Sequence, residues 1–83
     1  MRGIRWTNKA LAVLGGLTDT EKEAIFERLE LVAGFPEMYP VRERGVYGRL
    51  RYFVIRRRWI VYYRVEPEEL RVITIHPARA RPT

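Results

Sequence analysis

The sequence predicts an α+β domain in which a helical hairpin packs on one face of an antiparallel sheet, in the order β-α-α-β-β-β. Three observations lead to this fold class. The first half of the chain contains two stretches with apolar residues at helical spacing. The second half contains three runs rich in β-branched and aromatic residues. The chain has 83 residues, enough for one small core, so we expect residues 1–83 to form a single domain.

The first strand and the first helix are expected at the start of the chain. The segment RGIRW alternates charged and apolar residues and predicts a short strand that carries Ile4 and Trp6. Thr7 is suited to cap a short helix that buries Ala10, and Gly15–Gly16 ends it. Few residues separate this helix from the next one, so the two should form a hairpin.

The second helix has the clearest start and end signals. Thr18 and Glu21 have the spacing of a capping box, in which each residue satisfies a backbone N–H group of the other. Ile25 and Leu29 begin an apolar stripe on one side of the helix. Pro36 prevents the helix from continuing.

Three strands are expected after a polar loop that contains Pro40, Gly45 and Gly48. The strands are RLRYFVI at 49–55, WIVYYRV at 59–65 and LRVITIH at 70–76. Three arginines, Arg56, Arg57 and Arg58, lie between the first two of them. No glycine marks a two-residue turn there, so we expect a loop of three or more residues at the tip of this hairpin.

Alternation along each strand divides the side chains between two faces, and the helices can cover only one of them. The consistent choice buries Leu50, Val54, Trp59, Val61, Val65, Ile73 and Ile75. The open face then carries Arg49, Arg51, Phe53, Tyr62, Arg64 and His76, with Arg79 just beyond its edge. Arginines among aromatic rings suit single-stranded nucleic acid, since guanidinium groups bind phosphates and rings stack on bases. The alternative is an ordinary half-solvated sheet.

The net charge of +6 is unevenly distributed. Residues 1–40 carry five basic and six acidic side chains, whereas residues 41–83 carry eleven arginines and four acidic side chains. A basic surface on one side of a protein is typical of nucleic-acid binders. The arginine content alone is also consistent with a G·C-rich or heat-adapted genome.

Several classes of site and location are disfavoured. The chain has no cysteine, which excludes disulfides and thiolate zinc sites, and its one histidine has no acidic neighbours that would complete a metal site. We expect no metal and no cofactor. No apolar segment is long enough to span a membrane, and the first residues lack the apolar core of a signal peptide, so we expect a soluble, cytoplasmic protein.

The strands LRYFVI, WIVYYRV and VITIHPAR, in this order and spacing, resemble the RelE/ParE family of toxins from toxin–antitoxin pairs. The segment IRWTNKALAVLGGL is similar to the opening strand and first helix of that family, and RLELVAGFPEMYPVRE to the end of its second helix and the loop beyond. The resemblance covers nearly the whole chain and rests on many weak signals in order.

The resemblance implies one of two functions. RelE-like toxins cut mRNA in the ribosomal A site through attack by the 2′-hydroxyl, whereas ParE-like toxins inhibit DNA gyrase without being nucleases. Both kinds are held inactive by an antitoxin, for which an acidic segment wrapping the basic toxin would fit. A third possibility, from composition alone, is a small basic nucleic-acid-binding module.

The resemblance also implies site residues. Catalytic roles fall on Arg49, Arg51, Tyr62, His76 and Arg79, and phosphate contacts on Arg56, Arg57, Arg58, Arg64 and Arg81. His76 is equally well interpreted as a surface histidine at a strand end. One position departs from the family pattern, because Ile60 stands where an arginine of the third strand is expected. This departure weakens the case for the nuclease without excluding it, so we predict a ribosome-dependent endoribonuclease, with the gyrase inhibitor as the alternative that the departure motivates.

Overall fold

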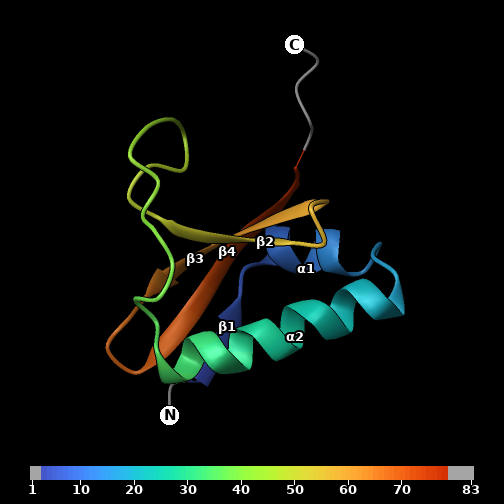
Figure 1. Cartoon of the computed structure of the whole chain (residues 1–83), viewed down its shortest axis with the longest axis horizontal. Coiled ribbons are helices and arrows are strands. Elements are labelled where there is room, and N and C mark those ends of the chain that lie inside the picture. Colours follow the sequence, from blue (N-terminus) through green and yellow to red (C-terminus); the bar gives the residue numbers. More distant parts are fainter. Residues whose placement is uncertain (1–2, 79–83) are drawn as a thin grey trace.

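The computed structural model of the chain describes residues 3–78, which form two helices and four strands (Figure 1). In chain order these are β1 (Gly3–Trp6), α1 (Asn8–Leu14), α2 (Asp19–Gly34), β2 (Arg51–Ile55), β3 (Trp59–Val65) and β4 (Glu69–Pro77). The predicted element order is confirmed. None of the helices in this part of the chain is long and apolar enough to cross a membrane.

The four strands form one mixed sheet in the order β1-β4-β3-β2. β2, β3 and β4 pair antiparallel, as predicted, but β1 runs parallel to β4, from Gly3 opposite Glu69 to Trp6 opposite Val72. The prediction of an antiparallel sheet throughout is therefore wrong for the first strand. Local patterns identify a strand but not its direction, which depends here on how the two helices carry the chain back to the sheet.

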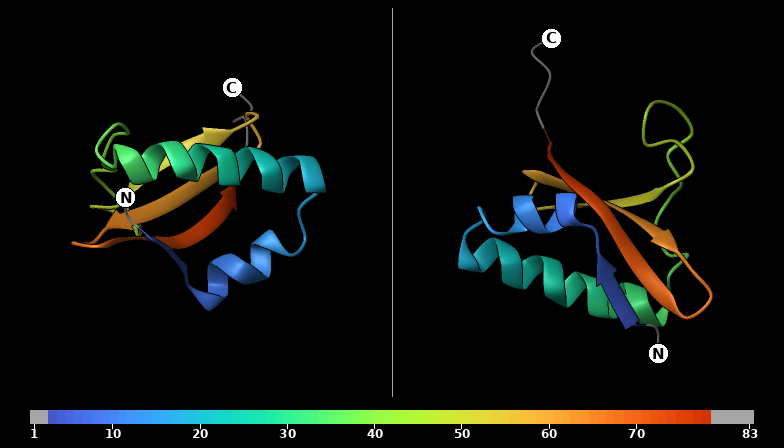
Figure 2. Two further views of the ribbon diagram at one scale, coloured as in Figure 1. Left: turned by 90° about the horizontal axis from the view of Figure 1, so that it is seen from below. Right: turned by 180° about the vertical axis from the view of Figure 1, so that it is seen from behind.

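Both helices contribute to a single hydrophobic core on one face of the sheet. Figure 2 shows α2 lying across this face. α1 follows β1 directly, and the Thr7 hydroxyl at its N-cap donates a hydrogen bond of 2.6 Å to the Ile73 carbonyl of β4. The core consists of Ala10, Leu17, Ile25, Leu29, Val32, Ala33, Phe53, Ile55, Val61, Tyr63, Leu70, Val72 and Ile75.

The predicted faces of β2 are interchanged. Phe53 and Ile55 are in the core, whereas Val54 is 42% exposed on the other side. The pairing sets this arrangement, because Phe53 lies opposite Val61 and Ile55 opposite Trp59. Three residues separate the strands, as expected, and two of them, Arg56 and Arg57, have positive φ. The geometry of this turn, which the sequence does not reveal, thus determines which side chains of β2 face the core.

A β-bulge changes the faces of β4. Tyr62 pairs with Thr74 but the next residue, Tyr63, pairs with Val72, so Ile73 is the extra residue. The first part of β4 therefore buries Leu70 and Val72, which were not predicted in the core, in place of Ile73. Beyond the bulge the predicted alternation is confirmed, since Ile75 is buried.

A buried carboxylate joins α2 to the β2–β3 hairpin. The predicted capping box is present: Thr18 Oγ1 accepts from the Glu21 N–H at 3.1 Å, and Glu21 Oε1 accepts from the Thr18 N–H at 2.9 Å. Glu21 Oε2 also accepts a 2.6 Å hydrogen bond from Trp59 Nε1 and lies 3.9 Å from an Arg58 nitrogen. The Thr18 and Trp59 N–H groups hold the pKa of Glu21 below its usual value of 4.5.

We expect Glu21→Gln to lower the melting temperature at pH 7, because the ionised acceptor is lost. A lowered pKa means that the native state binds the proton less readily than the unfolded chain does. The stabilisation is therefore complete above pH 4.5 and is lost as the pH falls through the lower pKa of the folded state. Thermal melts of both proteins between pH 7 and pH 2 should converge on acidification.

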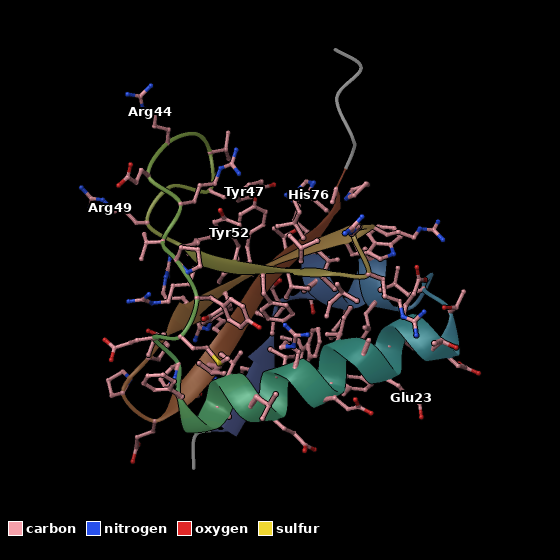
Figure 3. All side chains as sticks on the ribbon, in the orientation of Figure 1. Glu23, Arg44, Tyr47, Arg49, Tyr52 and His76 are labelled. Carbon is pink, nitrogen blue, oxygen red and sulfur yellow. The ribbon has the colours of Figure 1, made fainter. Side chains whose placement is uncertain are left out.

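Glu23→Gln provides the matched control for this experiment. Glu23 is on the same helix and is exposed, with its side chain pointing into solvent (Figure 3). We expect the Glu23→Gln variant to have the same melting temperature as the unchanged protein at every pH. An equal loss for both variants would mean that Glu21 acts only through general helix electrostatics.

Candidate functional site

The face of the sheet opposite the core, here called the open face, carries two rows of side chains at its centre. The cross-strand pairs define the rows, which are Tyr52, Tyr62 and Thr74, then Val54, Ile60 and His76. Neither of the two helices in residues 3–78 lies over these rows (Figure 2). Instead, a loop from the preceding segment of the chain covers them in part.

This loop, residues 42–49, is here called the flap. Its base is closed by two backbone hydrogen bonds of 2.7 Å, from the Arg42 N–H to the Leu50 carbonyl and from the Arg49 N–H to the Arg42 carbonyl. Gly45 has φ of 90°, a conformation that favours glycine and lets the chain reverse at the flap tip. Figure 1 shows the flap rising from the sheet at the start of β2.

Tyr47 extends from the flap onto the open face. Its ring stacks on Tyr62, with centroids 4.8 Å apart, and lies 4.9 Å from the His76 ring. Its hydroxyl is 2.6 Å from His76 Nε2 and accepts a 3.2 Å hydrogen bond from Lys9 Nζ at the start of α1. Figure 3 shows Tyr47 next to His76. One hydroxyl oxygen is thus held between an imidazole and an ammonium group.

Arg42 adds a second positive charge to this cluster. Its guanidinium donates a 3.0 Å hydrogen bond to the Tyr62 hydroxyl and lies over the Tyr62 ring. The cluster of Lys9, Arg42, Tyr47, Tyr62 and His76 therefore contains two cations, two hydroxyls and one imidazole. Such a set can bind a phosphate group and transfer a proton. Residues 3–78 contain no group of acidic, histidine or cysteine side chains that is arranged to bind a metal ion.

The structure brings together two of the predicted catalytic residues. Tyr62 and His76 lie in adjacent rows of the open face, although Tyr62 is only 3% exposed. Ile60 is directly opposite His76, so the arginine that the family pattern implies would lie beside the imidazole.

Arg49 and Arg51 do not join this cluster. Arg51 was predicted on the open face, but it shares the core face with its partner Tyr63 and donates a 2.6 Å hydrogen bond to the Tyr39 carbonyl. Arg49 is at the base of the flap and, with Arg44, points away from the sheet (Figure 3). The sequence placed both arginines by strand alternation, which fails because β2 begins only at Arg51 and its faces are interchanged.

The remaining predicted arginines lie around this centre or outside the described residues. Arg64 is exposed on the open face, on the far side of the bulge. Arg56, Arg57 and Arg58 are exposed at the opposite end of β2 from the flap, and Arg58 also pairs with Glu21. Arg79 and Arg81 lie beyond residue 78.

Sequence reasoning missed Lys9, Arg42 and Tyr47 as members of the site. Each of them contacts a residue that is distant in the sequence. Lys9 contacts Tyr47, 38 residues away, and Arg42 contacts Tyr62, 20 residues away. Tyr47 contacts His76, 29 residues away. A signal for Tyr47 was present, because an aromatic residue in a polar, glycine-containing loop needs a surface to pack against. Lys9 and Arg42 gave no such signal.

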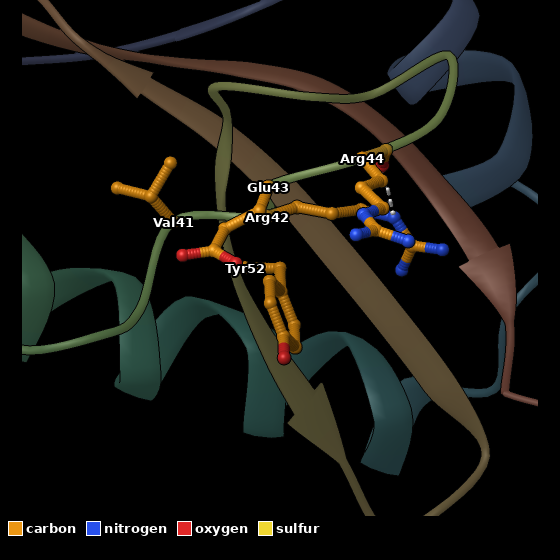
Figure 4. Close-up of a pocket in the computed structure, with 5 residues that line it drawn as sticks. All are labelled: Val41, Arg42, Glu43, Arg44 and Tyr52. Carbon is orange, nitrogen blue, oxygen red and sulfur yellow. Dashed lines mark hydrogen bonds between the residues drawn. The ribbon is translucent and has the colours of Figure 1, made fainter.

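A shallow pocket adjoins the cluster at the base of the flap (Figure 4). It has a volume of about 350 Å³ and is lined by Val41, Arg42, Glu43, Arg44 and Tyr52. Arg42 Nε donates to the Arg44 carbonyl at 3.1 Å, which holds the Arg42 side chain along one wall. Two guanidinium groups, one carboxylate and a tyrosine ring thus surround a space that is open to solvent (Figure 4).

Comparisons with known proteins agree with this fold. A chain of the intact E. coli RelBE toxin–antitoxin complex superposes with a TM-score of 0.79 at 19% identity, covering 96% of this chain and 100% of that one. The isolated E. coli RelE toxin superposes with a TM-score of 0.79 at 20% identity, covering 98% of this chain and 88% of that one. A chain of a chromosomal ParDE system from P. aeruginosa superposes with a TM-score of 0.70 at 21% identity, covering 95% of this chain and 98% of that one.

The family itself is shown by sequence. No curated protein matches the chain. A family model described as the ParE toxin of the type II toxin–antitoxin system parDE, however, matches residues 4–81. Since this match spans almost the whole sequence, the chain belongs to the ParE toxin family of type II toxin–antitoxin systems and shares its fold with RelE.

Proposed function

We propose that this toxin inhibits translation by cutting mRNA on the ribosome, with the reaction taking place on the open face. The observation that carries the proposal is the position of the Tyr47 hydroxyl, 2.6 Å from His76 Nε2 and 3.2 Å from Lys9 Nζ. RNA cleavage without a metal requires a ribose 2′-hydroxyl with an acceptor for its proton and a positive charge beside it, and the Tyr47 hydroxyl marks a position that offers both.

The proposed chemistry is attack by a ribose 2′-hydroxyl on the adjacent phosphorus. His76 Nε2 takes the 2′ proton as the new O–P bond forms, and Lys9 and Arg42 stabilise the charge that develops on the phosphate oxygens. The bond from phosphorus to the 5′ oxygen then breaks, this oxygen takes up a proton from water, and His76 releases the 2′ proton to solvent. The products are a 2′,3′-cyclic phosphate and a free 5′-hydroxyl group.

The surrounding arginines suit the path of the RNA strand. Arg42 and Arg44 beside Tyr52 form a pocket for a phosphate and a base, and Arg64 extends the positive surface along the open face. The tip arginines Arg56, Arg57 and Arg58, together with Arg79 and Arg81, complete the proposed set of phosphate contacts, whereas Arg49 points away from the sheet (Figure 3). Arg51 is excluded from it, because its guanidinium is on the core face of the sheet.

A ParE-like inhibitor of DNA gyrase is the second candidate. Two observations favour it: the family model that matches is that of ParE, and Ile60 leaves an apolar side chain opposite His76. In this case the open face binds the target protein and the chain cuts no RNA.

In both cases we propose a cognate antitoxin as partner. The similar structures include RelBE and ParDE, which are named as toxin–antitoxin assemblies. The net charge of +6, concentrated in the second half of the chain, is complementary to an acidic antitoxin segment.

His76→Gln tests the proposed chemistry. Glutamine keeps hydrogen-bonding capacity but cannot exchange a proton near neutral pH, so we expect cleavage of mRNA on purified ribosomes to slow by about 10²–10⁴-fold. Toxin purified away from its antitoxin would be assayed for cut sites by primer extension. Glu23→Gln, on the outer side of α2, should cut at the unchanged rate.

The same preparation decides between the two candidates. A toxin that cuts no RNA and blocks supercoiling by purified gyrase would overturn the nuclease proposal in favour of the ParE-like one. If the His76→Gln variant cuts mRNA at the unchanged rate, the proposed role of His76 is wrong, but the nuclease proposal itself is not overturned.

Ile60→Arg tests the meaning of the departure from the family pattern. Because Ile60 is opposite His76, an arginine there adds positive charge beside the reacting phosphate, and we expect faster cleavage by about tenfold or more. Val54→Arg is the matched control, since Val54 pairs with Ile60 on the same face but one strand further from His76. Equal rates for both variants would show that only overall charge matters.

A further inference from the structure

We propose that Tyr47 is an internal plug, which occupies a nucleotide-binding position on the open face until the flap swings away. The ligand that replaces it is a ribonucleotide, whose base stacks on Tyr62 and whose edge bonds to Thr74. The identity of the ligand rests on the proposed function, whereas the existence of the plugged site rests on the contacts below.

Tyr47 has the contacts that a bound nucleotide would have. Its ring lies against Tyr62 with an interplanar angle of 28°, the stacked arrangement in which bases bind aromatic side chains. Its hydroxyl meets His76 Nε2 at 2.6 Å, where a ribose hydroxyl would give up its proton. Lys9 Nζ, on the other side of this oxygen, is within reach of a phosphate.

The Tyr62 ring is covered in part by the flap and in part by the neighbouring rings of Tyr52 and His76. Tyr62 is 3% exposed, although neither α1 nor α2 lies over the central rows of its face (Figure 2). Two flap residues touch it, Tyr47 through the stacked rings and Arg42 through a hydrogen bond to the hydroxyl. Removal of the flap from this position would expose a flat aromatic ring flanked by cations, which is a surface suited to a nucleobase.

Thr74 indicates that the plug fits this position incompletely. It pairs with Tyr62 across the strands and is 1% exposed, yet its hydroxyl has no hydrogen-bond partner within residues 3–78. Buried hydroxyls in native proteins are nearly always paired, and an unpaired one calls for an explanation. A nucleobase edge has the N–H and carbonyl groups that would pair with it, and the tyrosine ring has none.

The flap is attached in a way that permits this exchange. Its backbone is secured at the base, through Arg42, Leu50 and Arg49, while at its tip Val46 is 93% exposed. Rotation of the tip breaks the two hydrogen bonds made by the Tyr47 hydroxyl and the contacts made by the Tyr47 ring. It leaves the hydrophobic core on the other face of the sheet unchanged. Small loops of this kind, with few buried apolar contacts, open at low cost.

Tyr47→Ala removes the plug and tests the proposal. Binding of adenosine 3′-monophosphate to the purified toxin would be measured by titration calorimetry. A plug that leaves about one molecule in ten open weakens the apparent affinity about tenfold, so we expect the variant to bind at least about tenfold more tightly. Unchanged or weaker binding would overturn the proposal.

Two controls make the result specific. Val46→Ala alters the neighbouring flap residue, which is exposed, and should leave the affinity unchanged. Ribose 5-phosphate, which has a phosphate but no base, should bind the Tyr47→Ala variant about tenfold or more weakly than adenosine 3′-monophosphate does, because it cannot stack on Tyr62. Equal affinities for the two ligands would mean that the variant merely exposes positive charge, and would contradict a base-stacking site.

Thr74→Val provides an independent test. Valine has the shape of threonine without the hydroxyl, so we expect the melting temperature to stay the same or rise, because no hydrogen bond is lost. In the Tyr47→Ala background the same change should weaken nucleotide binding about fivefold or more, while Thr74→Ser should retain it. A lower melting temperature, or binding unaffected by Thr74→Val, would contradict the role of Thr74.

These experiments are separate from those on the proposed reaction. They measure nucleotide binding without ribosomes, whereas the role of His76 is measured as cleavage. A toxin that cuts no RNA but binds nucleotide more tightly after Tyr47→Ala would retain the plugged site and lose the proposed function. A toxin that cuts mRNA but binds nucleotide no more tightly after Tyr47→Ala would support the proposed function and overturn the plugged site.

Discussion

The extra residue that β4 inserts at Ile73 is the constraint on which both faces of the sheet depend. Strict alternation from Leu70 and Val72 would place Thr74 and His76 on the core face as well. The bulge shifts the pattern by one residue, so that Ile75 joins the core and the two polar residues turn to the open face. Bulges often redirect a side chain next to a functional site. Here one irregularity completes the core and supplies the imidazole of the site.

The two ends of β2 differ in how firmly they are held. At the hairpin tip, the Glu21 carboxylate bonds the α2 N-terminus to Trp59 and Arg58. At the other end, the flap rests on the open face through side chains of Tyr47 and Arg42. Rigid packing and the loop that we propose to move thus meet on one short strand. This combination is common in binding proteins, because a firm scaffold positions the site while a loop of low local stability controls access to it.

The sequence was sufficient for features that depend on residues close together in the chain. The capping box of Thr18 and Glu21, the helix end before Pro36 and the three-residue hairpin tip are all present as predicted. Each depends on local backbone geometry and hydrogen bonds. The resemblance to the toxin family also came from local segments in order, and the family model spanning residues 4–81 confirmed it.

Only the tertiary structure decided the direction of β1, the faces of β2 and the composition of the site. Val54 and Phe53 exchange places because pairing with β3 selects the face, and hydropathy does not distinguish the two residues since both are apolar. Lys9, Arg42 and Tyr47 meet Tyr62 and His76 across 20 or more residues of chain. The physical reason is that capping and periodicity act over one or two turns of backbone, whereas register, bulges and loop placement result from contacts that form only when the whole chain has folded.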